Sequence, residues 1–268
     1  MQYNYLKKHI EALFTESTAL NANLLVLDSL VSERSSQLKT MFPPPNYDLI
    51  SMVSSYRDLS QLDGGDNLYD TGIHYKLHTD NLDEETLRLL SYVSCLTISQ
   101  VFEVFESFLK NILAESICQN IELMQVFNLE TADDQFNTVR KALKKIQGTS
   151  NKGFIKAIRK ISPFFKFHES KNIWDRNMSD WFNLIATVRH IVIHQRQNAG
   201  DDFIDLVKNG VRKKLFNRHF SFKGRLLVLT PYQANAIIDH LYEYSHLIYK
   251  GISQDFGLTM DFDFRPIK

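Results

Sequence analysis

The sequence is poor in cysteine, proline and glycine, and it lacks long uninterrupted hydrophobic runs. Among 268 residues there are 2 cysteines, 6 prolines and 10 glycines. Two cysteines are too few for a disulfide scaffold, and the low glycine and proline content excludes collagen-like and low-complexity chains. The apolar runs are shorter than the roughly 20 residues of a membrane-spanning helix, and charged residues interrupt the N-terminus early. We therefore expect a cytoplasmic globular protein with no membrane segment, in which Cys95 and Cys118 are core thiols.

Basic and acidic residues balance overall but are unevenly distributed. The chain has 31 residues of each sign, yet residues 1–139 hold 8 basic and 20 acidic residues, whereas residues 140–225 hold 20 and 6. The middle third therefore favours an anionic partner. Phenylalanines interleave with its basic residues, which suits RNA phosphates and bases, although the rings themselves also suit a protein core. The basic residues that we expect to contact RNA are Lys144, Lys145, Lys156, Arg159 and Lys160.

Helical spacing of apolar residues dominates the sequence and predicts an all-α fold. A long amphipathic helix covers the first forty residues and ends at Pro43, and a second, apolar on all sides, runs from Asp83 to about Cys118 through the centre. Thr230 caps the last helix, with proline in its first turn. Before it, two apolar runs flank Lys223-Gly224 and predict a small β-hairpin within residues 216–229. Shorter helices are expected over 48–59, from Thr131 to about 147, and over 153–161, 173–177 and 180–197.

No linker clearly divides the chain into two domains. We expect residues 1–80 to form a helical extension packed on the same domain, residues 81–255 to form the main helical bundle, and residues 256–268 to form a C-terminal tail. Asp63-Gly64-Gly65-Asp66 is typical of a loop within the extension.

The helix over 180–197, capped by Ser179, has two distinct apolar faces. At 100° per residue, a broad core face gathers Trp181, Leu184, Ile185, Val188, Ile191 and Val192. A polar stripe carries Asn183, Thr187, His190 and His194. Between that stripe and Arg189 lies a narrow second apolar strip of Phe182, Ala186 and Ile193. A helix face exposed only to solvent would not need phenylalanine and isoleucine, so the strip predicts a subunit interface.

The string Leu184-Ile185-Ala186-Thr187-Val188-Arg189-His190-Ile191-Val192-Ile193-His194 resembles the motif of the HEPN superfamily, an Arg followed by a polar residue and, four to six positions after the Arg, by a His. An earlier acidic and aromatic pattern, Val101-Phe102-Glu103-Val104-Phe105-Glu106-Ser107-Phe108-Leu109, is similar to that of the family. The resemblance covers about residues 83–255 and leaves residues 1–80 unmatched.

The resemblance implies a HEPN-like helical bundle and a metal-independent endoribonuclease that acts as a homodimer. Such enzymes are often toxins or anti-phage effectors, so an antitoxin or defence-system protein is an expected partner. The matching positions are Arg189, His190 and His194. In that chemistry a ribose 2′-OH attacks the adjacent phosphorus, His194 moves a proton, and Arg189 stabilises the phosphorane charge. His190 either orients the pair or contacts the phosphate, and no cofactor is needed.

Other interpretations of the same residues remain open. His190 and His194 have the i, i+4 spacing of metal ligands, but Ile191 stands where a zinc metalloprotease has glutamate, and a third ligand would have to come from a distant residue such as His168. We therefore predict no metal site. Glu103 and Glu106 are either members of the site or partners of an arginine at the edge of the core. The alternative function is a catalytically silent HEPN-like module that binds RNA, a nucleotide or a partner protein.

Overall fold

The computed structural model describes residues 3–43, 45, 47–57, 68–120, 122–129, 135–146, 151–174 and 176–260, without the side chains of residues 144–146, 151 and 152. In chain order the elements are α1 (Lys7–Met41), β1 (Asp48–Tyr56), β2 (Tyr69–His78), α2 (Leu82–Gln119), α3 (Glu122–Val126), α4 (Phe136–Ile146), α5 (Asn151–Ile161), α6 (Pro163–His168), α7 (Met178–Gln195), α8 (Asp201–Val207), α9 (Gly210–His219), β3 (Ser221–Lys223), β4 (Leu226–Val228) and α10 (Pro231–Asp255).

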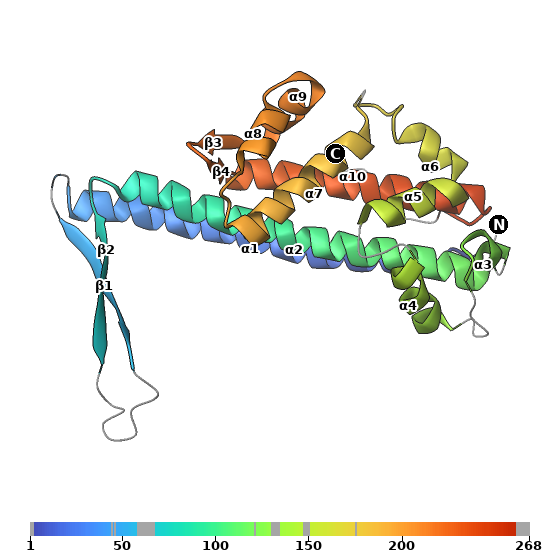
Figure 1. The fold of residues 1–268 in the computed structure, drawn as a ribbon, viewed down its shortest axis with the longest axis horizontal. Coiled ribbons are helices and arrows are strands. Elements are labelled where there is room, and N and C mark those ends of the chain that lie inside the picture. Colours follow the sequence, from blue (N-terminus) through green and yellow to red (C-terminus); the bar gives the residue numbers. More distant parts are fainter. Residues whose placement is uncertain are drawn as a thin grey trace.

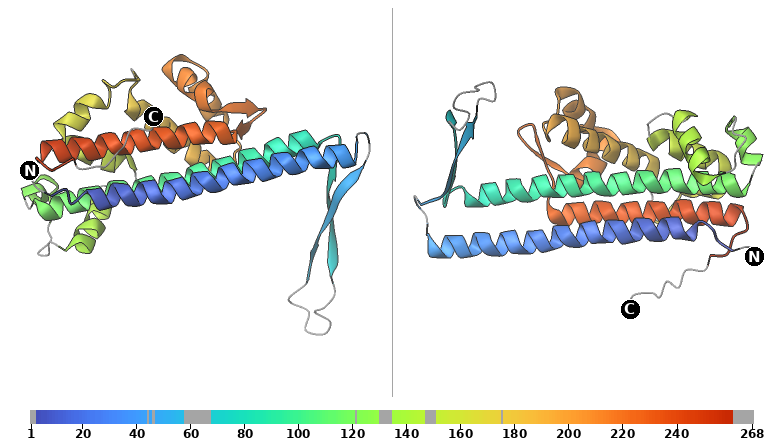
Figure 2. Two further views of the ribbon diagram at one scale, coloured as in Figure 1. Left: turned by 180° about the vertical axis from the view of Figure 1, so that it is seen from behind. Right: turned by 90° about the horizontal axis from the view of Figure 1, so that it is seen from below.

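Three long helices, α1, α2 and α10, form the frame of the molecule (Figures 1 and 2). α2 packs against both of the others, and α1 also packs against α10. Aromatic rings fill the centre, where Phe105 stacks on Tyr244 with ring centroids 5.9 Å apart. The mostly helical architecture confirms the all-α prediction, including the two long helices expected in the first forty residues and after Asp83.

The central helix α2 is also the one described helix that is long and apolar enough to cross a membrane by length and composition. Half of its most apolar stretch is buried inside the protein. Core helices of globular proteins pass the same test, so this composition is weak evidence for a membrane span.

An exposed antiparallel ribbon occupies the segment for which we predicted a helix over 48–59, and that prediction is wrong. β1 pairs with β2, with Ile50 opposite Leu77 and Tyr56 opposite Tyr69. The ribbon projects from the end of α1 and α2 that lies away from the N-terminus (Figure 1). Tyr69–His78 carries aromatic and β-branched residues and pairs with β1, which favours strands over an isolated short helix. The predicted loop at 63–66 lies outside the described residues.

The small hairpin before the last helix is present but shorter than predicted. β3 and β4 pair from Ser221 to Val228, and Gly224 takes the positive φ of 63° that their turn requires. Residues 216–219 belong to α9 instead. α8 and α9 were not predicted.

Two local predictions have different outcomes. Thr230 caps α10 in a full capping box with Gln233, as its Thr-Pro start indicates. The prediction of a helix over 173–177 is wrong, because the described residues of this segment form a turn. There the Asn172 side chain donates to the backbone carbonyls of Glu169 and Arg176, which offers the chain an alternative to helical hydrogen bonds.

Candidate functional site

The motif helix α7 is fixed at both ends by side-chain and backbone caps. Asn177 accepts hydrogen bonds from the backbone N–H groups of Ser179 and Asp180, so the cap lies two residues before the predicted Ser179. At the other end Arg196 and Gln197 adopt left-handed conformations, with φ of 50° and 65°. α7 therefore begins and ends at defined residues, which fixes the direction of its side chains.

The two main faces of α7 lie as the helical wheel predicts. All six residues of the predicted core face are buried. Asn183 and Thr187 of the polar stripe are half-buried, whereas His190 and His194 are exposed. The two imidazole rings lie next to each other, with centroids 4.6 Å apart. Two neighbouring histidines are thus presented to solvent by a helix that is otherwise anchored in the core.

Arg189 lies at the edge of the core and pairs with a residue of α2. Its guanidinium forms an ion pair with the carboxylate of Glu103. The guanidinium carbon lies 5.7 Å from the centre of the Phe102 ring, within the range of a cation–π contact. Burial lowers the pKa of Arg189 from its usual value, and its Nε makes no hydrogen bond among the described residues.

One of the two glutamates in the acidic and aromatic pattern of α2 contacts the motif arginine. Glu103 holds Arg189, whereas Glu106 pairs with Lys110 on its own helix at 2.5 Å. The Phe102 ring beneath Arg189 stacks in turn on the ring of Phe182, with centroids 5.1 Å apart. Of the two roles considered for these glutamates, Glu103 has that of a partner to an arginine at the edge of the core.

One chain does not bring all the motif residues to one point. Arg189 and His194 are separated by about 7.5 Å along the α7 axis and about 140° around it. His190 and His194 are adjacent, but Arg189 faces α2. Both groups contact one phosphate only if a second copy of the helix brings its motif alongside the first. Otherwise they contact different parts of a substrate that spans the two faces of α7.

The predicted interface strip is only partly at the surface. Phe182 is 2% exposed and packs on Phe102, Phe105 and Tyr244, so it faces the core of its own chain and its assignment to a subunit interface is wrong. Ala186 is half-buried against the core. Ile193 is 44% exposed and is the strip residue best placed to meet another protein.

The residues predicted to contact RNA lie on two helices, α4 and α5. Lys156 and Lys160 are exposed on α5, and the Lys160 ammonium lies 6.0 Å from the centre of the Phe127 ring. Lys144 and Lys145 lie on α4, but their side chains are outside the described residues.

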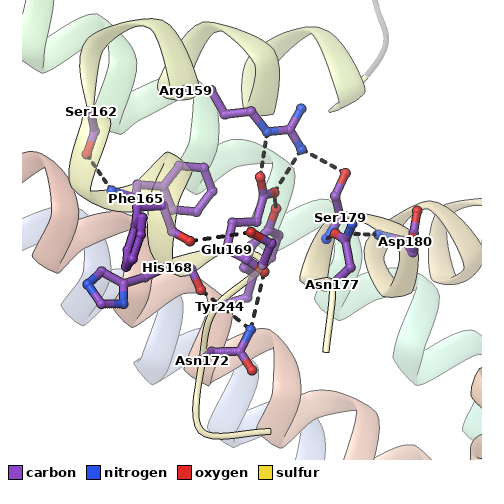
Figure 3. Close-up of polar contacts among 12 residues, drawn as sticks. Arg159, Ser162, Phe165, His168, Glu169, Asn172, Asn177, Ser179, Asp180 and Tyr244 are labelled. Carbon is purple, nitrogen blue, oxygen red and sulfur yellow. Dashed lines mark hydrogen bonds and ion pairs between the residues drawn. The ribbon is translucent and has the colours of Figure 1, made fainter. Parts of the chain in front are cut away.

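Arg159, which we predicted to contact RNA, has a structural role instead. Its guanidinium donates to both carboxylate oxygens of Glu169, at 2.6 and 2.8 Å, and to the hydroxyl of Ser179 at 2.8 Å (Figure 3). Tyr244 donates to the same carboxylate from α10. Glu169 raises the pKa of Arg159, and burial together with Glu169 raises that of Tyr244. The network joins α5, the start of α7 and α10. The guanidinium donors of Arg159 are therefore used inside the protein.

Metal ligands do not cluster in the part of the chain that the structure describes. No group of three or more His, Cys, Asp or Glu side chains there is placed to hold a metal ion. Comparisons of the chain with protein-family models, curated proteins and solved structures find no match. The resemblance to the HEPN superfamily therefore rests on the residues of α2 and α7.

Proposed function

We propose that the chain is a metal-independent endoribonuclease of HEPN type. The observation that carries this proposal is the presentation of exposed His190 and His194, with Arg189, on a helix whose other face is fully buried. Packing accounts for the position of Arg189 but does not require two exposed histidines beside each other. Proton transfer and stabilisation of phosphate charge both require groups of these kinds.

The proposed reaction is transesterification within the RNA backbone. The ribose 2′-oxygen attacks the adjacent phosphorus and loses its proton, the bond from phosphorus to the 5′-oxygen breaks, and that oxygen takes up a proton. The products are a 2′,3′-cyclic phosphate and a 5′-hydroxyl. His194 transfers a proton, Arg189 binds the phosphorane oxygens through its planar donors, and His190 orients the imidazole or contacts the phosphate.

The geometry of α7 supports the proposal of a homodimer. Because Arg189 and His194 point in different directions, a two-fold axis beside α7 would let the motifs of two chains share one cleft. Ile193, with Ala186 about two turns earlier on the same strip, is the apolar surface proposed for that contact. Exposed Lys156 and Lys160 remain proposed RNA contacts outside the cleft. We propose a toxin or anti-phage role, in which an antitoxin or defence-system protein controls the activity.

A silent RNA-binding, nucleotide-binding or partner-docking module is the second candidate. The ion pair between Arg189 and Glu103 favours it, because a neutralised guanidinium is a weaker ligand for a phosphate. In that case the α7 surface would bind without cutting.

Cleavage of total RNA by the purified protein in EDTA separates the two candidates. We expect fragments with 2′,3′-cyclic phosphate ends, at a rate that added magnesium or zinc does not raise. Intact RNA after long incubation at high enzyme concentration would support the silent module, and cleavage that depends on added metal would contradict the proposed chemistry.

A further inference from the structure

A cavity of about 750 Å³ lies between α1, α2, the base of the ribbon and the turn that follows α7. Its lining includes three arginines from separate parts of the chain, Arg34, Arg88 and Arg196. Aliphatic side chains, among them Leu38, Leu77 and Leu226, form much of the remaining wall. The size is that of a pocket for a small molecule or a short stretch of a polymer.

The charges around this cavity favour an anion. Glu85 is the one carboxylate among the lining residues, and it pairs with Arg88 at 2.6 Å. Arg34 and Arg196 are exposed and make no ion pair among the described residues. Two guanidinium groups are therefore uncompensated at the cavity, and both have the planar donors that suit phosphate oxygens.

Two tyrosines give the cavity flat apolar surfaces. Tyr75 and Tyr92 are 41% and 49% exposed, although both line it. The Tyr75 hydroxyl donates to Glu85 at 3.0 Å, and the Arg88 guanidinium carbon lies 5.9 Å from the Tyr75 ring centre. Glu85 thus holds a tyrosine and an arginine together at the ribbon base. Half-exposed aromatic rings beside arginines are the surfaces on which single-stranded bases stack.

The cavity adjoins the end of the motif helix. Arg196 follows His194 by two residues, and Gln197 also lines the cavity. The N–H of Gln197 donates to the carbonyl of Ile191, while its side chain donates to Cys95 of α2 at 3.0 Å. This turn is therefore firmly attached to α2, and a strand bound near His194 can continue past Arg196.

We propose that the cavity binds a single-stranded segment of the RNA substrate, with Arg34 and Arg196 on its phosphates and Tyr75 and Tyr92 stacking on its bases. The inference rests on the proposed function, because it assigns a binding site to the same substrate. The aliphatic wall alone would also suit an acidic amphipathic protein helix. The two rings and the position beside His194 favour RNA.

Binding of an uncleavable strand tests the inference separately from catalysis. A fluorescent 2′-O-methyl oligouridylate of about 12 nucleotides spans one single-strand site and lacks the nucleophile. With the full chain, we expect Tyr92→Ala to raise its Kd about tenfold, as the loss of one stacked base does. Arg196→Gln should raise Kd about fivefold and lower the slope of log Kd against log salt by about one. Arg212→Gln, an exposed arginine on α9 outside the cavity, should bind like the unmodified protein.

Photocrosslinking with a 4-thiouridine strand gives a second readout on the unmodified chain, should either variant fold poorly. Crosslinks within the peptides that carry Tyr75, Tyr92 or Arg196 are expected. Unchanged affinity in both variants, crosslinks confined to α5, or no binding of the strand would overturn the inference, as would an acidic amphipathic peptide that binds at Tyr92 where RNA does not.

If the strand binds in the cavity but RNA is never cut, the proposed function fails and the inference stands. If RNA is cut while the cavity variants bind normally, the reverse holds.

Discussion

The guanidinium of Arg189 on α7 pairs with the carboxylate of Glu103 on α2, although the two residues lie 86 positions apart in the sequence. Glu103 is 56% exposed and Arg189 26% exposed, so solvent and ligands reach the pair. A phosphate that binds Arg189 must therefore compete with this carboxylate. The pair both positions the arginine and limits its affinity for an anion.

Replacing Glu103 with glutamine should strengthen RNA binding. The change removes a negative charge beside the proposed phosphate site and keeps the side-chain size, so we expect Kd for a 2′-O-methyl RNA to fall about threefold at low salt. Fluorescence anisotropy measures the affinity. Glu106→Gln is the matched control, because Glu106 lies one turn further along α2 and pairs with Lys110 instead. Equal or weaker binding by Glu103→Gln would show that Arg189 does not contact the phosphate.

Arg189→Ala and His194→Ala should each remove most of the cleavage. Proton transfer by a positioned side chain contributes about 100-fold or more, and groups that act as one unit are not additive. We expect kcat/KM in EDTA to fall at least about 100-fold in each variant and little further in the double variant. Gln195→Ala, an exposed change on the same helix, should cleave normally. Full activity in Arg189→Ala would remove this arginine from the mechanism.

The sequence allows the long helices and the core face of α7 to be predicted, because burial repeats with the helical period. Trp181 and Ile185 are buried as the wheel requires, and the Thr230 cap is a local signal that needs no tertiary context. The exposed ribbon has no such period, since both of its faces are open to solvent and Ile50 and Met52 are exposed like their neighbours. Neither strand of the ribbon has a hydrophobic pattern of its own, so only the pairing of the two strands in the structure identifies them.

Contacts between distant elements account for the errors at the site. Arg159 resembles the lysines around it in sequence, and only its position opposite Glu169 and Tyr244 shows that its donors are occupied. Phe182 lies on a separate strip of the isolated wheel, but α2 and α10 cover it. Arg34 and Arg196 come together at one cavity through the packing of α1 and α7 around α2, which no local pattern reveals.

Arg159→Leu should destabilise the protein without a specific effect on RNA. The change leaves the Glu169 carboxylate, which is 7% exposed, without its charged partner, and such losses cost about 3 kcal/mol. Lys156→Leu, on the exposed side of the same helix, should change the free energy of unfolding by less than about 0.5 kcal/mol. Urea unfolding measures both. Equal stability of the two variants, together with weaker RNA binding by Arg159→Leu, would restore Arg159 as an RNA contact.

The buried His219 should make the protein less stable in acid. His219 is 1% exposed, its Nε2 accepts from the Trp181 indole, and burial, with His240 and Arg218 nearby, lowers its pKa to about 4. In the unfolded chain histidine takes up its proton near pH 6.5, so the unfolded state binds more protons between about pH 6.5 and 4. The free energy of unfolding therefore falls across that window by about 3 kcal/mol from this residue.

Urea unfolding at pH 7.5 and 4.5 measures this effect. His219→Gln keeps a hydrogen-bond acceptor but cannot titrate, so it should lose less stability on acidification than the unmodified protein. Parallel losses in the two proteins would mean that other groups, chiefly carboxylates, cause the acid sensitivity.

Ile193→Asp should convert a dimer into a monomer and lower RNA cleavage with it. Ile193 is 44% exposed between the two faces of α7, and a two-fold contact there would bury it beside its copy, whereas paired aspartates would repel each other. Light scattering at micromolar concentration should give twice the 31.2 kDa chain mass for the unmodified protein and a value near 31.2 kDa for the variant. Leu206→Asp is the matched control, since Leu206 is 40% exposed on α8 and should leave the dimer intact. Within one chain Arg189 and His194 point in different directions, so the proposed site needs two chains. The rate of RNA cleavage by the variant should therefore rise with protein concentration as dimers reform. A monomeric unmodified protein that cuts RNA would contradict the shared cleft and require both groups to act from one chain.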